Sequence, residues 1–191
     1  MLSHFSGEIK QCVDDGEVIV NFVDGKKQGL TRFINNNGII LSEVPYENNE
    51  IHGKLKQYYQ SGSLLAIIEY EQGIPSGKFV SFYENGMKRL ETYYRNGEFD
   101  GEFITFDEYG DKTSESLYRN GLKFGKSVSY YPKSQGGGMF EISNYNEKGL
   151  LTGDCVLLYP TGEIMAVTPY LNGKAQAYTK NYTKSRAEIY T

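Results

Sequence analysis

The sequence predicts an all-β protein, an elongated single-layer antiparallel meander of about seven β-hairpin repeats of 24 residues each. Glycines recur with a step of 24 residues at Gly29, Gly53, Gly77, Gly101 and Gly125. A second series keeps the same step at Gly38, Gly62, Gly86 and Gly110. The composition, with 17 Tyr, 10 Phe and 22 Gly in 191 residues, favours short strands joined by tight turns. A fixed period of this size is typical of repeat architectures.

Each repeat begins with a turn motif that contains Asn-Gly or Asp-Gly in most copies, such as Asn96-Gly97. Both residues tolerate positive φ, which the tight turns of hairpins require. The glycine four residues later predicts a bulge or a close backbone approach where the next strand starts. The motif occurs at residues 24–29, 48–53, 72–77, 96–101, 120–125, 148–153 and 172–177.

Two strands follow each turn, and the second ends at a tyrosine. Alternation places Tyr58, Val80 and Val128 on one face, which we expect to be the core. The return-strand tyrosines are expected to form a ladder along the sheet; they include Tyr46, Tyr70, Tyr94, Tyr118 and Tyr170. A single-layer sheet cannot bury both faces against itself, so some aromatic surface should stay open.

The period divides the chain into three predicted parts. Residues 1–22 form N-terminal capping strands, residues 23–178 form the repeat array, and residues 179–191 form a C-terminal capping strand or tail. The step from Gly125 to Gly153 is four residues too long, and the surplus is expected at an insertion, residues 132–138. This insertion is either a tolerated loop or a functional one.

Composition excludes several classes of protein. The formal net charge of −4 argues against a nucleic-acid binder, which would normally carry a basic surplus. No run of 18 apolar residues and no signal peptide is visible, so a soluble, cytoplasmic protein is expected. Cys12 and Cys155 are expected to be reduced core residues.

Residues with catalytic chemistry are scarce. His52 lies inside a turn, at a position that other repeats fill with unrelated residues. No Cys or His pair has metal-ligand spacing, and no phosphate-binding or nucleophile motif occurs. The sequence therefore predicts a protein without a cofactor, metal or enzymatic activity.

The consensus of the array resembles the MORN repeat in its bacterial variant form. The match is carried by residues such as Tyr59, Gly62, Tyr70, Gly73 and Gly77, and it recurs in phase along about residues 22–178. Asn49, where glycine is expected, and Asp107 depart from the pattern. The resemblance implies a twisted β-sheet that serves as a scaffold or binding surface, with phospholipid binding proposed for some members. Bacterial variants resemble antitoxin or immunity proteins that block a partner by binding it.

Two sets of residues are candidates for binding such a partner. One is a set of tyrosines beside the core position, on the opposite face: Tyr59, Tyr83, Tyr131 and Tyr159. They form either a partner-binding surface or a ladder that only stiffens the sheet. The other is a run of carboxylates that hairpins would bring to turn edges: Glu98, Asp100, Glu102, Asp107, Glu108 and Asp111. These form either an acidic patch that attracts a basic partner or a solvated rim.

The leading hypothesis is an immunity or antitoxin protein that neutralises a toxin or secreted effector by direct binding. The alternative is a scaffold or peripheral membrane protein. It would use basic residues near the C-terminus, which are Lys174, Lys180, Lys184 and Arg186. The net charge makes membrane binding the weaker of the two hypotheses.

Overall fold

The computed structural model describes residues 4–176 and 180–182, and it confirms the all-β, antiparallel hairpin-repeat fold. Apart from one short 3₁₀ helix, the regular structure of these residues consists of strands. Contacts divide the chain into two compact units, Met1–Glu98 and Phe99–Thr191. Because the 24-residue period continues across this boundary, the sequence pattern does not predict the division.

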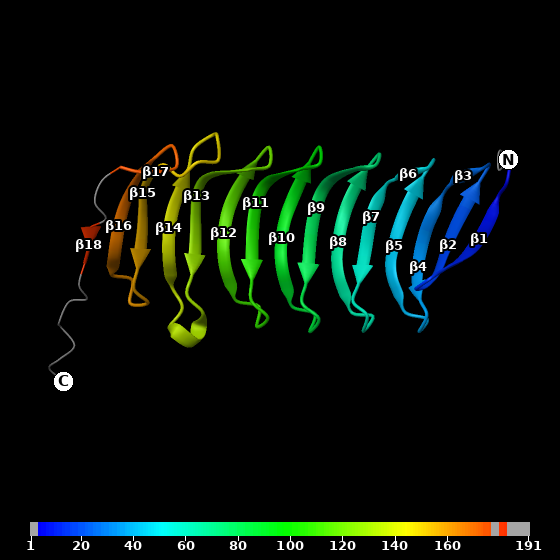
Figure 1. The fold of residues 1–191 in the computed structure, drawn as a ribbon, viewed down its shortest axis with the longest axis horizontal. Coiled ribbons are helices and arrows are strands. Elements are labelled where there is room, and N and C mark those ends of the chain that lie inside the picture. Colours follow the sequence, from blue (N-terminus) through cyan, green and yellow to red (C-terminus); the bar gives the residue numbers. More distant parts are fainter. Residues whose placement is uncertain (1–3, 177–179, 183–191) are drawn as a thin grey trace. The chain divides into compact units, whose positions relative to one another are not determined.

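Unit 1 is an antiparallel meander in which each long strand pairs with the next (Figure 1). Its strands are β1 (Gly7–Val13), β2 (Gly16–Val23), β3 (Lys26–Lys27), β4 (Gly29–Asn35), β5 (Ile40–Glu47), β6 (Glu50–Ile51), β7 (Gly53–Tyr58), β8 (Leu64–Glu71), β9 (Ile74–Phe82) and β10 (Lys88–Arg95).

Unit 2 repeats the same arrangement, and its first strand starts one residue before the boundary. Its elements are β11 (Glu98–Phe106), β12 (Lys112–Arg119), β13 (Leu122–Tyr130), η1 (Lys133–Gln135), β14 (Met139–Tyr145), β15 (Gly153–Leu158), β16 (Ile164–Leu171), β17 (Lys174–Ala175) and β18 (Lys180–Asn181).

The turns between repeats have the predicted chemistry. Asn96 and Gly97 both have positive φ, 52° and 84°, which is the signature of a two-residue hairpin turn. Asn49 has a φ of 73° where other repeats have glycine, because asparagine tolerates this conformation. The closing glycine coincides with a bulge, as the register shift of β13 against Ser116 and Leu117 beside Gly125 shows.

The four residues that exceed the 24-residue period are divided between two turns, and the predicted insertion at 132–138 contains only some of them. The loop there closes with a hydrogen bond from the Tyr131 N–H to the Gly138 carbonyl, whereas the standard turn closes from Tyr59 to Ser63. That makes the loop three residues longer. The remaining residue lies in the turn that follows β14. Tyr145 pairs with Leu151, six residues later, whereas the corresponding Tyr118 pairs with Lys123, five residues later.

Rows of cross-strand partners define two faces of each unit. We call one the aromatic face; its central row is Leu55, Ile68, Phe79 and Thr92 in unit 1, and Phe103, Ser116, Ser127 and Ser143 in unit 2. We call the other the carboxylate face; its row includes Arg32, Glu43, Lys56 and Glu91 in unit 1, and Ile104, Glu115 and Val128 in unit 2.

Most of the buried residues do not lie on the face that the sequence predicts to be the core, so this prediction is wrong for them. The face of Tyr58, Val80 and Val128 is the carboxylate face, and Ile19, Val128 and Leu158 are its buried members. The remaining buried residues lie on the aromatic face: Leu55, Ala66, Thr92, Ser116, Ser127, Ser143 and Ala166. Most of them are small, because larger aromatic neighbours cover this row. Thr92 is completely buried.

The return-strand tyrosines also lie on the aromatic face, but they do not form a continuous ladder. The Tyr94 ring packs against Phe79 with centroids 6.0 Å apart, and the Tyr118 ring packs against Phe103 at 4.9 Å. Equivalent tyrosines are two strands apart, about 9.6 Å, which exceeds direct ring contact. Tyr94 and Tyr118 instead pack against an aromatic residue of the preceding strand.

The N-terminal segment continues the meander. β1 pairs with β2 along its whole length, and Phe5 packs edge-on against Phe22 at 6.1 Å. Cys12 is exposed on β1, so the prediction that it is a core residue is wrong. Cys155 is half-buried, and burial together with the neighbouring Glu141 raises the pKa of its thiol.

Candidate partner-binding surfaces

Tyrosines proposed for partner binding donate hydrogen bonds to the backbone of the following repeat. The Tyr59 hydroxyl donates to the Phe82 carbonyl at 2.8 Å, and the Tyr131 hydroxyl donates to the Leu158 carbonyl at 2.9 Å. The Tyr159 hydroxyl donates to the Tyr182 carbonyl at 3.2 Å. We call these contacts tyrosine straps. They favour the alternative in which the tyrosines stiffen the sheet.

Tyr83, the fourth of these tyrosines, is also half-buried, and the Arg89 guanidinium lies 5.9 Å from its ring centroid. A cation over an aromatic face is attracted by the ring quadrupole. Tyr83 therefore also has a contact inside its own unit.

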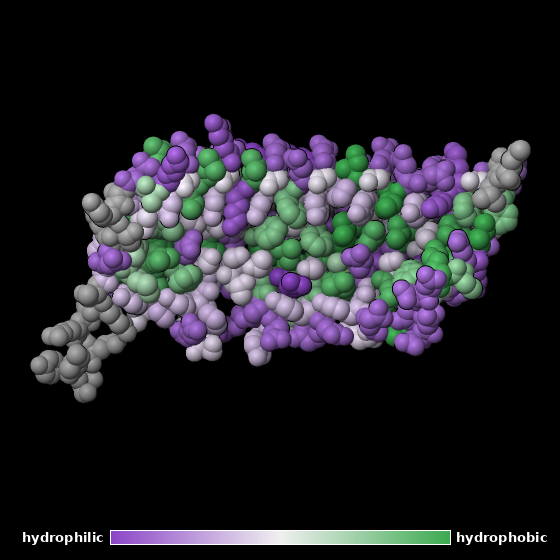
Figure 2. All heavy atoms as spheres, in the orientation of Figure 1, coloured by the Kyte–Doolittle hydropathy of each residue, from purple (hydrophilic) through white to green (hydrophobic). Residues whose placement is uncertain are grey.

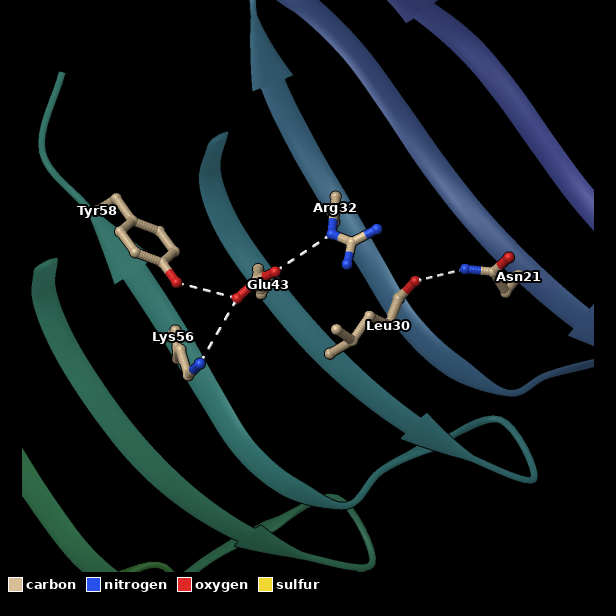
Figure 3. A network of polar contacts seen from close by, with 6 residues as sticks. All are labelled: Asn21, Leu30, Arg32, Glu43, Lys56 and Tyr58. Atoms are coloured by element: carbon tan, nitrogen blue, oxygen red, sulfur yellow. Dashed lines mark hydrogen bonds and ion pairs between the residues drawn. The ribbon is translucent and has the colours of Figure 1, made fainter. Parts of the chain in front are cut away.

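On the carboxylate face, Glu43 is held by three neighbours from adjacent strands (Figure 3). Its carboxylate accepts hydrogen bonds from Arg32 Nε at 3.2 Å and from the Tyr58 hydroxyl at 2.9 Å, and Lys56 Nζ lies 3.8 Å away. Burial alone would raise the pKa of Glu43, but these hydrogen bonds and charges lower it below its usual value. Because 14% of the Glu43 side chain is exposed, these neighbours replace most of its hydration.

Glutamates at the repeat position of Glu43 form two further sites of this kind. Glu91 contacts Lys78 and Lys88, each at 2.6 Å. Glu115 contacts Lys112 at 2.7 Å and accepts a hydrogen bond from Tyr130 at 2.5 Å. Burial and this hydrogen bond raise the pKa of Tyr130 to about 12. We call the three sites carboxylate clasps. They are not among the residues predicted from the sequence, although their glutamates always stand three residues before a return-strand tyrosine.

The clasps predict that acid destabilises the fold. Hydrogen bonds from lysine lower the pKa of Glu91 and, with one from Tyr130, that of Glu115. A carboxyl with a lowered folded pKa stabilises the protein above its unfolded pKa, about 4.3, and this stability is lost as pH falls through the folded pKa. Urea unfolding midpoints should therefore change little between about pH 7 and 5 and drop below about pH 4.3.

Glu91→Gln should reduce this acid-dependent drop, because the amide cannot take up a proton. Glu50→Gln, at an exposed position, is the matched control and should follow the wild-type curve. Identical pH profiles for the wild type and Glu91→Gln would contradict the role given to the clasp.

The six carboxylates of the predicted acidic patch do not gather at one place. Glu98, Asp100 and Glu102 lie at the start of β11, whereas Asp107, Glu108 and Asp111 follow its end. The five residue-to-residue steps from Glu102 to Asp107 along the extended strand span about 17 Å. The second group forms a compact turn, in which Asp107 Oδ1 accepts the N–H groups of Tyr109 at 3.0 Å and Asp111 at 2.9 Å.

This turn presents a residue that the sequence analysis did not select. Tyr109 is 79% exposed, more than any other large apolar or aromatic residue of the described chain. Its position before the turn glycine is filled by Ser61, Asn85 and Thr161 in other repeats. The sequence therefore does mark Tyr109, because an aromatic residue stands where the other repeats have small polar ones.

The 132–138 loop lies beside this turn. Lys133 Nζ contacts Asp111 Oδ1 at 2.5 Å, and a Cβ at Gly136 would lie 3.7 Å from Pro160 Cβ. The loop therefore pairs with the turn before it and lies close to the turn after it. Met139 and Phe140, which follow the loop, are also exposed. We call the surface of Tyr109, Lys133, Met139 and Phe140 the Tyr109 edge.

The carboxylate face of unit 2 also has a hollow of about 220 Å³. Its apolar part is formed by Ile104, Leu117 and Val128, and Glu102 lies at it together with Lys126. Glu102 is the one residue of the predicted acidic set that lines this hollow.

Other sites are not evident in the part of the chain that the structure describes. Within it, no group of three or more His, Cys, Asp or Glu side chains is arranged to hold a metal ion. None of its helices is long and apolar enough to span a membrane. Of the predicted basic residues, Lys174 is exposed and Lys180 lies in β18, whereas Lys184 and Arg186 lie outside the described residues.

Comparison with known families agrees with the repeat geometry. The model of the MORN repeat variant matches residues 51–72 and 75–97, which are two successive repeats of unit 1. No curated protein matches the chain. The matched segments contain β7 to β10, and the same turns, straps and clasps recur outside them. The two matched segments are therefore repeats similar to the MORN repeat variant, and the chain repeats their geometry outside them.

Proposed function

We propose that this protein acts without catalysis, by binding another protein at the Tyr109 edge. The observation that carries the proposal is the exposure of Tyr109, 79%, at a turn held by two hydrogen bonds to Asp107. An exposed aromatic side chain on a preorganised backbone loses little conformational entropy when it binds.

The surroundings of Tyr109 fit a basic partner. Asp107, Glu108 and Asp111 flank the tyrosine, while Lys133 is the cation that pairs with Asp111. Carboxylates around an aromatic anchor favour a partner with lysine or arginine beside an apolar pocket, and they increase its rate of association. Within this general function we propose the immunity or antitoxin role, in which the partner is a toxin or secreted effector.

The test is co-purification of the protein with the products of the adjacent reading frames. We expect one of them to bind, and Tyr109→Ser, which restores the residue type of the other repeats, to weaken binding by about 30-fold or more. Tyr93→Ser is the matched control, since Tyr93 is an exposed tyrosine of unit 1.

Each result bears on a different part of the proposal. If no neighbouring product binds, the immunity role is wrong. If one binds and Tyr109→Ser leaves its affinity unchanged, the Tyr109 edge is not the binding surface. A loss of affinity in Tyr93→Ser equal to that in Tyr109→Ser would likewise contradict the assignment to unit 2.

A further inference from the structure

The turns at the opposite end of the unit 2 strands carry a second apolar surface. Leu122, Leu150 and Leu171 are 46%, 40% and 55% exposed, and each lies in one of three successive turns. Figure 2 shows apolar groups among hydrophilic ones along the edge that carries these turns. We call this surface, formed by residues 119–122, 146–150 and 171–174, the leucine edge.

Leu122 and Leu150 each lie close to the glycine of the next turn. A Cβ at Gly149 would lie 3.4 Å from Leu122 Cβ, and a Cβ at Gly173 would lie 3.6 Å from Leu150 Cδ2. The glycines therefore leave room for a continuous apolar line across three turns. In unit 1 the position of Leu122 is filled by Lys26, Glu50 and Ile74, so no such line forms there.

Cations accompany the leucines. Arg119, Lys123, Lys148 and Lys174 lie in or next to the three turns, with Glu147 as the one carboxylate of these turns. The Arg119 guanidinium lies 4.0 Å from the Phe124 ring centroid, and Lys123 Nζ lies 5.2 Å from that of Tyr145. Across the described residues, none of the four cations forms an ion pair.

The spacing of the leucines suits one kind of occupant. Leu122 starts β13, and Leu150 precedes β15, which lies two strands further along the sheet, about 9.6 Å. Leu171 ends the next strand, β16, about 4.8 Å further. On a helix, residues seven apart are separated by about 10.5 Å and residues three or four apart by about 5 Å. A single helix face can therefore place apolar residues against all three leucines.

We propose that the leucine edge docks an acidic amphipathic helix of a protein partner. The apolar face of the helix lies on Leu122, Leu150 and Leu171, and its flanking carboxylates face the four cations. A hollow of about 320 Å³, lined by Arg119, Leu122, Phe124 and Glu147 among others, receives one apolar side chain of the helix. This surface is separate from the Tyr109 edge, so it extends the proposed function rather than depending on it.

The test uses a synthetic peptide of about 21 residues, three heptads, with leucine at the first and fourth positions and glutamate on the flanks. Fluorescence anisotropy should show saturable binding to the full chain that weakens as salt is added. Leu150→Glu and Lys148→Glu should each weaken it by about tenfold or more. Ile74→Glu, at the equivalent exposed position of unit 1, and Tyr109→Ser should leave it unchanged.

Several outcomes would overturn the proposal. One is equal binding of a peptide with the same composition whose leucines are spread around the helix. Another is equal loss of affinity in Ile74→Glu and Leu150→Glu. A third is association with vesicles of anionic phospholipid in place of the peptide, which would identify the edge as a membrane contact. Lys148→Glu changes an exposed charge and removes no apolar contact of the edge, so its result does not depend on repacking of the leucines.

Discussion

Replacing Gly16 with alanine is expected to lower the free energy of unfolding by about 3 kcal/mol. Gly16 has a φ of 153° and pairs with Val13 on β1 and with Asn35 on β4. An added Cβ would overlap the Ile34 carbonyl oxygen and lie 2.8 Å from the Asn35 Cα atom. Because both atoms belong to the backbone, they cannot move aside without breaking the pairing of β2 with β4.

Gly38→Ala is the matched control for this prediction. Gly38 has a φ of 79°, but a Cβ there would meet no atom within 4 Å. Only the conformational cost of a left-handed alanine remains, about 1 kcal/mol. Urea unfolding followed by circular dichroism compares the two variants. Equal losses would show that the backbone conformation, and not the overlap with Ile34, dominates at Gly16.

Val128→Asp should cost about 3–4 kcal/mol, the largest effect expected in unit 2. Val128 is 3% exposed on the carboxylate face, between its cross-strand partners Glu115 and Ile142. The introduced carboxyl would lose its hydration and lie beside the carboxylate of Glu115. Both effects raise the pKa of the introduced group, so it takes up a proton as pH falls, and the penalty relative to wild type should shrink.

Leu117→Asp tests whether burial is the cause. Leu117 lies on the same face and lines the same hollow, but it is 42% exposed. Its replacement should cost less than about 1 kcal/mol, and the cost should depend little on pH. Unfolding measurements for both variants at about pH 7 and pH 5 separate the two cases. A similar loss for Leu117→Asp would contradict the view that the Val128 side chain is specially enclosed.

The fold could be predicted from the sequence because its determinants are local. Asn96-Gly97 specifies a two-residue turn by its tolerance of positive φ, and the 24-residue step repeats that instruction along the chain. The face that would be buried was harder to predict, because both faces alternate polar and apolar residues. The alternation predicts that Tyr58 is a core residue, yet its hydroxyl donates a hydrogen bond to the Glu43 carboxylate. Leu55, on the other face, is buried.

The candidate site was predictable only in part, since contacts between repeats are not visible in a single repeat. The alternation in the sequence predicts an open position for Tyr59, but its hydroxyl donates a hydrogen bond to the Phe82 carbonyl of the following repeat. Asp107 was selected for its charge, and in the structure it orders the turn that exposes Tyr109. Departures from the consensus, such as Tyr109, were a better guide to surface function than the conforming positions.

The tyrosine straps make the 24-residue period the unit in which this chain can change its length. A strap joins a side chain of one hairpin to the backbone of the next, so removing a whole period leaves every remaining tyrosine opposite a carbonyl. A deletion of another length inside the strands would leave one hydroxyl without its acceptor and shift the strand register. MORN-type arrays of this kind should therefore be shortened or extended by complete hairpins, while loop insertions such as residues 132–138 leave the straps in place.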